Sequence, residues 1–251
     1  MSEQNKSHIA APPGTKAIVF AAGMGTRFKP WTDLHPKALA LVHGKTLLER
    51  NIEYLQGFGI YDLIVNVHHF PQQIIQAIGA SSGWGSRVSI SDETGELLET
   101  GGGLNKASWF FDSGPFVAIN VDILTDLDLG SMLSYHMERR PLATLAVTGR
   151  RSSRYFLFTP EGLLGGWRNE ATGAEKILLT DQPLLPWAFS GVQVLDPRLF
   201  SAVRLAGKFS LVDLYLDLAR SERILAYDHS GSKLIDVGRT EAVQEAERLF
   251  A

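Results

Sequence analysis

Cysteine is absent from the 251-residue chain. This excludes disulfide scaffolds, thiolate zinc sites and cysteine nucleophiles, and it favours a reducing compartment. Long hydrophobic runs are missing too. Residues 1–16, MSEQNKSHIAAPPGTK, lack the apolar segment of a signal peptide, and no stretch approaches the ~18 uninterrupted apolar residues of a membrane helix. We therefore expect a soluble, cytoplasmic protein without a membrane partner.

Positive charge is not in excess. Lys and Arg number 24 against 27 Asp and Glu, which gives a formal net charge of −3. Proteins that neutralise the phosphates of a nucleic acid usually carry a surplus of cations, so we expect no nucleic-acid partner. With 45% hydrophobic residues the chain can bury a sizeable core, which excludes a disordered or fibrous protein.

The chain is expected to fold as one domain after a short tail. Residues 1–15 are polar and contain Pro12, Pro13 and Gly14, which predicts a flexible N-terminal tail. Residues 16–251 are expected to form a single domain, because α/β chains of ~250 residues often fold as one unit.

Short apolar runs alternate with helical-period stretches as far as residue 148. The runs are apolar at consecutive positions, which is typical of strands buried on both faces of a parallel sheet. The expected strands are 16–21, 62–67, 87–91, 115–120 and 142–147, and the expected helices are 46–59, 70–79, one starting near Gly103, and 129–138. The alternation predicts an α/β fold with a doubly wound, mostly parallel, Rossmann-like sheet.

The pattern changes after residue 148. Short segments separated by Gly, Pro and Asn predict hairpins of a small β-rich lid, at 155–158, 162–167, 176–180 and 189–195. Further on, a helix is expected at 210–221 and strands at 224–227 and 234–238. The last helix, 240–250, is expected to begin with Thr240 as its N-cap.

Two glycines, Gly23 and Gly25, directly follow the first expected strand. Glycines there let backbone N–H groups approach an anion such as a triphosphate, although tight turns also use glycine for steric reasons alone. Two common phosphate motifs fail. The dinucleotide motif GxGxxG needs glycine where Phe28 stands, and a Walker loop needs Lys and Ser or Thr where Thr26 and Arg27 stand.

Two cations follow the glycines, Arg27 and Lys37. A guanidinium and an ammonium on one loop suit a site where a phosphate leaving group accumulates charge, and the alternative is that both are ordinary surface cations. The run FAAGMGTRFKPWTDLHPKALA, residues 20–40, resembles the signature A-A-G-x-G-T-R…P-K-A-L of the sugar-1-phosphate nucleotidylyltransferases, also called sugar nucleotide pyrophosphorylases.

The resemblance extends along the chain from residue 16. The run ETGGG at 99–103 resembles the second nucleotide-contacting loop of the family, most of all in its N-acetylmuramate-1-phosphate uridylyltransferases and short mannose-1-phosphate enzymes. Without the resemblance, the same glycines read as a flexible turn. The nucleotide contacts that the resemblance implies are Ala21, Ala22, Gly23, Met24, Gly25, Thr26, Arg27, Glu99, Thr100, Gly101 and Gly102.

Two aspartates, Asp122 and Asp236, are the metal ligands that the resemblance implies. Asp122 stands at the carboxyl end of an apolar strand, where ligands of open α/β sheets gather, although Val121 replaces the glycine usual in the family. Asp236 lies in LIDVG, which resembles the W-x-D-x-G-T segment of the family; otherwise it belongs to the start of the last helix after Gly238. Mg²⁺ is a hard cation that accepts one or two carboxylates together with phosphate oxygens and water.

The sugar side is less complete. The run FSGVQVL at 189–195 resembles the strand that lines the sugar pocket, but the V-E-K-P element of the family is not recognisable, so Lys176 is expected to supply a cation instead. The sugar-phosphate contacts implied are Lys37, Asn120, Ser190, Gly191 and Lys176. Residues 16–148 are expected to bind mainly the nucleotide, and residues 149–235 mainly the sugar.

The implied activity is the Mg²⁺-dependent condensation of an NTP with a sugar 1-phosphate, with pyrophosphate as the second product. Arg27, Lys37 and Asp122 are its implied catalytic residues. The ETGGG run favours UTP with N-acetylmuramic acid 1-phosphate. The alternatives are GTP with mannose 1-phosphate or another hexose or heptose 1-phosphate, and a non-catalytic regulator that binds nucleotide sugars.

Overall fold

The computed structural model describes residues 9–112 and 114–250. Its strands are β1 (Lys16–Phe20), β2 (Leu41–Val42), β3 (Lys45–Thr46), β4 (Asp62–Val67), β5 (Arg87–Asp92), β6 (Phe116–Asn120), β7 (Ile123–Thr125), β8 (Ala143–Thr148), β9 (Arg154–Phe158), β10 (Leu164–Asn169), β11 (Ala174–Ile177), β12 (Leu185–Leu195), β13 (Ile224–Asp228) and β14 (Leu234–Asp236). Its α-helices are α1 (Leu47–Gln56), α2 (Pro71–Ala80), α3 (Glu99–Lys106), α4 (Leu129–Arg139), α5 (Arg198–Ala202), α6 (Leu211–Leu218) and α7 (Glu241–Leu249). Short 3₁₀ turns occur at Thr26–Phe28, Trp31–Asp33, Lys37–Leu39, Ser82–Gly85 and Ser108–Phe110.

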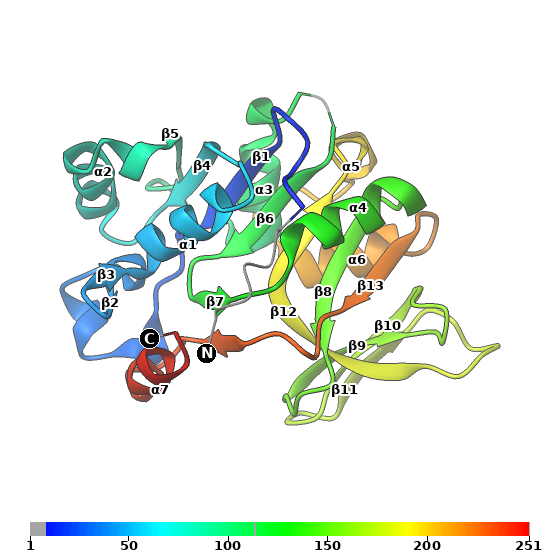
Figure 1. Cartoon of the computed structure of the whole chain (residues 1–251). Helices are drawn as coiled ribbons and strands as arrows, with labels where there is room; N and C mark the ends of the chain where they lie inside the picture. The colour runs from blue at the N-terminus through cyan, green and yellow to red at the C-terminus, as the bar shows by residue number, and fades with distance from the viewer. Residues whose placement is uncertain (1–8, 113, 251) are drawn as a thin grey trace, which may run out of the picture.

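A mostly parallel sheet forms the centre of the molecule (Figure 1). Strands β5, β4, β1 and β6 lie side by side in parallel, and β8 and β13 form a second parallel pair. Strand β12 lies between β6 and β8 and is antiparallel to both. The predicted α/β class and the mostly parallel, Rossmann-like sheet are confirmed.

Helices cover both faces of this sheet, as the continuous apolar strands predict. On β1, Ala17 and Val19 point into a core shared with α1, α2, α4 and α7, whereas Ile18 and Phe20 point into a core shared with α3, α5 and α6. All four of these side chains are buried. Because β1 is packed on both faces, the position at which the following loop begins is fixed.

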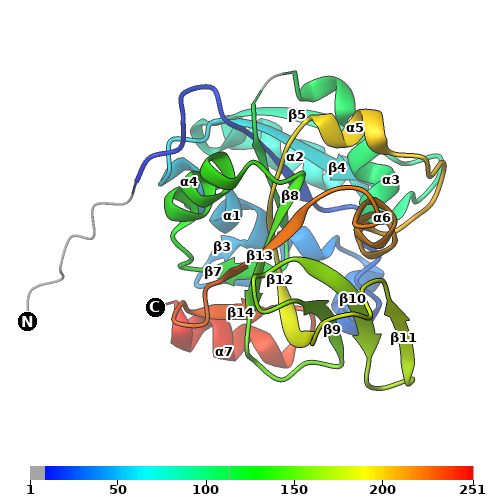
Figure 2. The same cartoon turned by 90° about the vertical axis from the view of Figure 1, so that its right-hand side faces the viewer.

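A small antiparallel layer, β9, β10 and β11, lies at one end of the molecule (Figure 2). Strand β12 joins it to the main sheet, because residues Leu185–Trp187 pair with β9 while Val192–Leu195 pair with β6. The pairing of β12 with β8 shifts between Phe189 and Gln193. This layer is the β-rich lid expected after residue 148.

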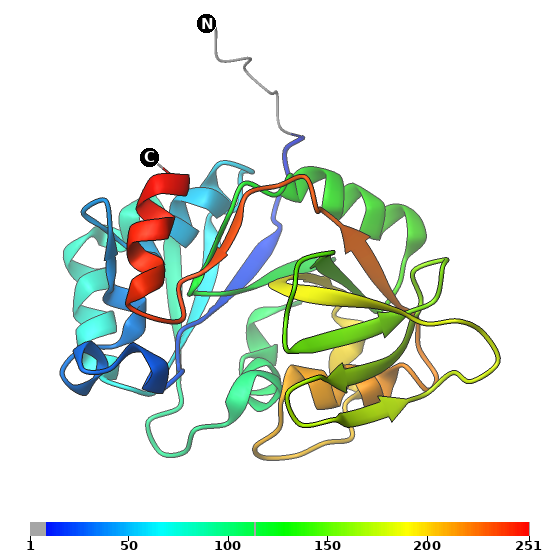
Figure 3. The ribbon, with the colours of Figure 1, turned by 90° about the horizontal axis from the view of Figure 1, so that it is seen from below.

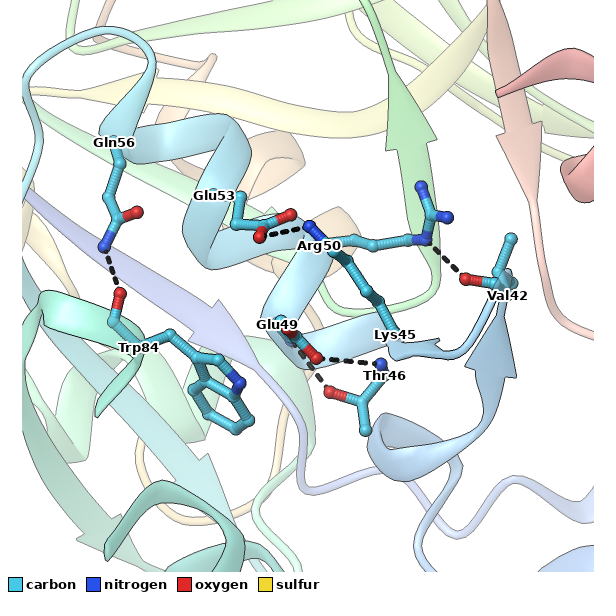
Figure 4. A network of polar contacts seen from close by, with 8 residues as sticks. All are labelled: Val42, Lys45, Thr46, Glu49, Arg50, Glu53, Gln56 and Trp84. Atoms are coloured by element: carbon cyan, nitrogen blue, oxygen red, sulfur yellow. Dashed lines mark hydrogen bonds and ion pairs between the residues drawn. The ribbon is translucent and has the colours of Figure 1, made fainter. Parts of the chain in front are cut away.

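Helix α1 illustrates how local polar contacts set an element (Figure 4). Thr46 caps the helix by accepting from the Glu49 N–H at 3.0 Å, and the Glu49 carboxylate accepts from the Thr46 N–H at 3.4 Å, which is a capping box. Arg50 donates from Nε to the Val42 carbonyl at 2.8 Å. The helix is therefore tied to the β2–β3 hairpin, which also lies beside α7 (Figure 3).

Three local expectations were wrong. The helix expected near Gly103 begins at Glu99, so the ETGGG run is helical. Thr240 has helical backbone angles and its side chain caps nothing. Residues 9–15, expected in a loose tail, contact the domain: the Ala11 N–H donates to the Phe58 carbonyl at 2.8 Å, while residues 1–8 lie outside the described residues.

Across residues 9–112 and 114–250, no helix combines the length and apolar character that a membrane crossing requires.

His136 gives the fold a predictable dependence on pH. It lies on α4 with 1% of its surface exposed, and its Nδ1 is hydrogen-bonded to the Thr144 hydroxyl at 2.8 Å. Burial lowers the pKa of His136 from 6.5 to about 4. Because only the unfolded chain accepts the proton between these values, the stabilising contribution is complete above pH 6.5 and is lost as the pH falls towards 4.

We predict that His136→Gln removes this contribution to the pH dependence of stability. The free energy of unfolding of the wild type should fall, relative to the variant, by up to about 3 kcal/mol between about pH 7.5 and about pH 4.5. Urea unfolding at both pH values measures the difference, with the exposed His35→Gln as the control. Wild-type and His136→Gln stabilities that change in parallel with pH would contradict this account.

Candidate active site

The loop after β1 presents free backbone N–H groups. Within the described residues, the N–H groups of residues 23–26 have no hydrogen-bond acceptor. Gly25 has a φ of 60°, and a Cβ on it would lie 2.8 Å from Thr32 Cγ2, so both its backbone conformation and the close approach of Thr32 require glycine. The Thr32 hydroxyl donates to the Gly25 carbonyl at 2.9 Å. The result is a fixed turn with donors left over for an anion.

Asn66, at the end of β4, holds the beginning of this loop. Its Oδ1 accepts from the N–H groups of Ala21 at 2.7 Å and Ala22 at 3.3 Å, and its Nδ2 donates to Glu93 Oε1 at 2.7 Å. Glu93 is fully buried, and burial raises its pKa, against which the hydrogen bonds from Asn66 and from the Leu98 N–H act. The amide of Asn66 thus has one defined orientation.

The glycines of the ETGGG run serve close packing. A Cβ on Gly101 would lie 2.5 Å from the Phe209 ring, one on Gly102 would lie 2.3 Å from the Gly207 carbonyl oxygen, and one on Gly103 would lie 2.5 Å from Glu93 Oε1. The N–H groups of Gly101 and Gly102 both donate to the Phe209 carbonyl, at 3.0 and 3.1 Å. The expected loop with free backbone groups is therefore replaced by a helix wedged between two segments.

A cavity of about 310 Å³ lies between the β1 loop and α3. Its lining residues are Phe20, Ala22, Gly23, Asn66, Leu97, Glu99 and Thr100. Glu99 has a φ of 60°, which is strained for a residue with a side chain. An adjoining cavity of about 180 Å³ shares Phe20, Gly23 and Thr100 and reaches Lys37, Asn120 and Asp122. The predicted nucleotide residues Ala22, Gly23, Glu99 and Thr100 therefore face one continuous space.

The two predicted metal carboxylates are brought together by strand pairing. Strand β7 starts directly after Asp122 and pairs antiparallel with β14, so that Asp236 lies opposite Ile123. The Val237 N–H donates to the Asp122 carbonyl at 2.8 Å. Asn51, buried on α1, donates to the Val121 carbonyl at 2.9 Å and holds the same segment from the other side.

The charges at this junction compensate one another. Lys37 Nζ forms an ion pair with Asp122 Oδ2, and the Arg27 guanidinium lies beside Asp236 at Gly238, where a Cβ would meet atoms of both side chains within 3 Å. Desolvation and then the negative charge of Asp122 raise the pKa of Asp236, while Lys37, Arg27 and Arg150 lower it. Two carboxylates that repel each other are a donor set that suits a divalent cation.

The carboxylates alone do not complete a metal site. Within residues 9–112 and 114–250, no group of three or more His, Cys, Asp or Glu side chains could hold a metal. A pair of carboxylates is nevertheless what Mg²⁺ uses when substrate phosphates and water supply its remaining ligands.

A cavity of about 450 Å³ lies on the side of the β-rich lid. Its lining residues are Arg27, Arg150, Ser152, Ser153, Arg154, Tyr155, Phe156, Trp167, Phe189, Val212 and Asp236. Because Arg27 and Asp236 also belong to the charged junction, this cavity opens from the same region. Gly191 has a φ of 75° and brings the β12 backbone against the Asn120 amide, where a Cβ would meet Nδ2 at 3.0 Å.

Two residues predicted to contact the sugar phosphate lie elsewhere. Ser190 is buried, and its hydroxyl is hydrogen-bonded to His229 Nε2 at 2.7 Å. Lys176 lies on the exposed strand β11, where it forms an ion pair with Asp213 at 2.9 Å and does not line the cavity. The cations that line this cavity, apart from Arg27, are Arg150 and Arg154.

Sequence reasoning missed four residues: Asn66, Glu93, Arg150 and Arg154. Asn66 could have been found, because it is a polar residue in the otherwise apolar strand DLIVNV. The run GRRSSR at 149–154 is also unusually cationic. Nothing local to Glu93 indicates that it is buried.

Comparisons with known proteins agree with this geometry. A family model described as nucleotidyl transferase matches residues 16–156. The N-acetylmuramate alpha-1-phosphate uridylyltransferase of Caulobacter vibrioides is 30% identical over 242 residues, which cover 94% of this chain and 96% of that protein. The protein of the same name from Neisseria meningitidis serogroup B is 29% identical over 240 residues, 93% and 97% of the two chains.

Solved structures share the fold. HddC from Yersinia pseudotuberculosis, complexed with GMP-PN, superposes with a TM-score of 0.75 at 20% identity, over 94% of this chain and all of that one. The fold of this chain is therefore one already seen in a solved structure.

We predict opposite effects of alanine at two helical glycines. Alanine usually stabilises a helix by about 0.5–1 kcal/mol relative to glycine, and Gly79→Ala in α2 should do so because nothing lies within 4 Å of its Cβ position. Gly102→Ala should instead destabilise the protein by about 1–3 kcal/mol, because the new methyl group meets the Gly207 carbonyl.

Urea unfolding of both variants measures these changes. Equal stabilisation by the two substitutions would show that α3 is not wedged against residues 207–209.

Proposed function

The chain belongs to the nucleotidyl transferase family, and we propose that it condenses UTP with N-acetylmuramic acid 1-phosphate to give UDP-N-acetylmuramic acid and pyrophosphate. One observation carries the proposal. Arg27 and Lys37, from the loop after β1, meet Asp122 and Asp236, from two segments remote in the sequence, between the cavity that reaches Thr100 and the lid cavity. The two relatives named for this reaction, which match over almost their whole length, support the choice of substrates.

The reaction needs charge control more than proton transfer. An oxygen of the sugar phosphate, already anionic at neutral pH, forms the new bond to the α-phosphorus of UTP, and the bond between that phosphorus and the bridging oxygen of pyrophosphate breaks. No protein nucleophile or general base is required. The enzyme has to bring two anions together and stabilise a third as it leaves.

We assign these tasks to residues already in place. Arg27 and the free N–H groups of residues 23–26 bind the β- and γ-phosphates, which become pyrophosphate. Lys37 exchanges its partner Asp122 for the α-phosphate and the incoming sugar phosphate. Asp122 and Asp236 would hold Mg²⁺, which would supply charge neutralisation and polarisation of a phosphate oxygen.

The binding roles divide along the chain. Residues 16–148 supply the nucleotide site, with Glu99 and Thr100 against the base-side cavity. Residues 149–235 supply the sugar site. Gly101 and Gly102 keep a packing role, because their N–H groups are already bonded. We also propose a cytoplasmic location, where UTP is available.

We predict one preferred substrate pair. Pyrophosphate release should be fastest with UTP and N-acetylmuramic acid 1-phosphate in a matrix of the four ribonucleotides and dTTP against several sugar 1-phosphates, and EDTA should abolish it. Preference for GTP with mannose 1-phosphate would replace the proposed substrates. A folded protein that binds nucleotides but turns over no substrate pair would support the alternative of a non-catalytic regulator that binds nucleotide sugars.

We predict that Asp122→Asn loses at least about 100-fold in kcat while the protein stays folded, because the amide cannot offset the charge at the junction. Asp181→Asn, on the exposed surface, is the matched control. Circular dichroism checks the fold of both variants. Wild-type turnover of Asp122→Asn at limiting Mg²⁺ would rule out Asp122 as a metal ligand.

A further inference from the structure

A second group of cations lies on the sugar side, apart from the phosphate site. Of the charged residues lining the lid cavity, Arg27 and Asp236 belong to the junction described above, which leaves Arg150 and Arg154. Neither of these two arginines forms an ion pair with a described carboxylate. Other surface arginines, such as Arg87 with Asp62 and Arg198 with Asp196, are paired in that way.

Arg150 is fixed by neutral partners. Its Nη2 donates to the Phe189 carbonyl at 2.8 Å, and its Nη1 donates to the Ala188 carbonyl at 3.2 Å and the Thr148 hydroxyl at 3.1 Å. Desolvation lowers the pKa of Arg150, against the weaker influence of Asp236. Because Arg150 is exposed and forms no ion pair with a described carboxylate, it can bind an anion of a ligand.

Arg154 stands at the start of β9 with an exposed side chain. Its N–H donates to the Ser152 hydroxyl at 3.2 Å, so the turn that carries it is ordered. Ser152 and Ser153 line the same cavity and add hydroxyl groups beside the two arginines. The remaining lining is largely aromatic, namely Tyr155, Phe156, Trp167 and Phe189.

The lid cavity carries more positive charge than the binding of a neutral sugar requires. A hexose 1-phosphate carries its charge only at the phosphate, to which the proposed function already assigns Lys37. N-acetylmuramic acid 1-phosphate carries a second anion, the carboxylate of the lactyl ether on C3, across the ring from the phosphate. Guanidinium groups bind carboxylates through paired hydrogen bonds and discriminate strongly against analogues that lack the anion.

We infer that Arg150 and Arg154 bind a carboxylate on the sugar and so select acidic sugar 1-phosphates over neutral ones. The inference rests on the proposed function for the identity of the acid, but the charge argument holds for any sugar 1-phosphate that bears a carboxylate. Arg154 is the accessible partner, and Arg150 is the anchored one.

The test compares two sugars that differ only in the lactyl group, N-acetylmuramic acid 1-phosphate and N-acetylglucosamine 1-phosphate. Arg154→Gln should lower kcat/KM for the acidic sugar by about 10- to 100-fold, mainly by raising KM. The ratio of kcat for the acidic sugar to kcat for the neutral sugar should stay near the wild-type ratio. The matched control is Arg151→Gln, because Arg151 is an exposed neighbour that does not line the cavity. Arg150→Lys keeps the positive charge but removes the planar guanidinium group that donates paired hydrogen bonds. It should give a smaller loss of kcat/KM for the acidic sugar.

Three outcomes separate the possibilities. An equal loss for both sugars, or no loss in Arg154→Gln, would overturn the inference while the proposed function stands. A wild-type enzyme that rejects N-acetylmuramic acid 1-phosphate would overturn the proposed function. In that case glucuronic acid 1-phosphate against glucose 1-phosphate tests the arginines independently: a preference for the acid that Arg154→Gln abolishes supports the inference, and its absence overturns it.

Discussion

The ion pair between Lys37 and Asp122 is the interaction on which the charged centre depends. Without an opposing cation, Asp122 and Asp236 would face each other as two carboxylates; burial and then the charge of Asp122 raise the pKa of Asp236, and Lys37 acts against both. Lys37 can occupy this position because Gly25 allows the loop to fold closely over Thr32 and Lys37. The anionic and cationic groups of the junction therefore compensate each other in the protein alone, and the proposed function has a phosphate exchange partners with them.

Helix α3 is also held by close contacts within the protein. Consecutive glycines let the segment 207–209 approach on one side and the Glu93–Asn66 pair on the other. Asn66 in turn holds the first N–H groups of the β1 loop. The β1 loop, helix α3 and the segment before α6 form one hydrogen-bonded unit. Contacts within the protein therefore set the shape of the cavity between the β1 loop and α3.

The strands and helices of the parallel sheet were predictable because each is a long apolar or periodic segment. The four charged residues of the centre followed from the resemblance to one family, in which Arg27 and Lys37 belong to one signature and Asp122 and Asp236 to two other segments. The role of the ETGGG glycines was not predictable, because it depends on Phe209 and Gly207, which are remote in the sequence. The place of Lys176 was not predictable for a similar reason: its ion-pair partner Asp213 lies on α6, and only the folded chain shows that Lys176 is paired there and is not among the residues that line the cavity. The place of such residues depends on neighbours that are remote in the sequence, and a local sequence pattern does not show these neighbours.

The two pairs of arginine and lysine cations that the proposals use lie in different parts of the fold. Arg27 and Lys37 lie on the loop that leaves the rigid strand β1, whereas Arg150 and Arg154 lie where β8 passes into the antiparallel layer. Strand β12 belongs to both regions, and its shift in register at Phe189 turns it from the main sheet towards the lid. Because Arg150 bonds to carbonyls at that same turn, the lid arginine is positioned by the strand that also borders the sheet. In the proposed function, a change of sugar would therefore be accommodated by side chains of the lid, while the proposed phosphate site stays on the sheet, where both cores fix its geometry.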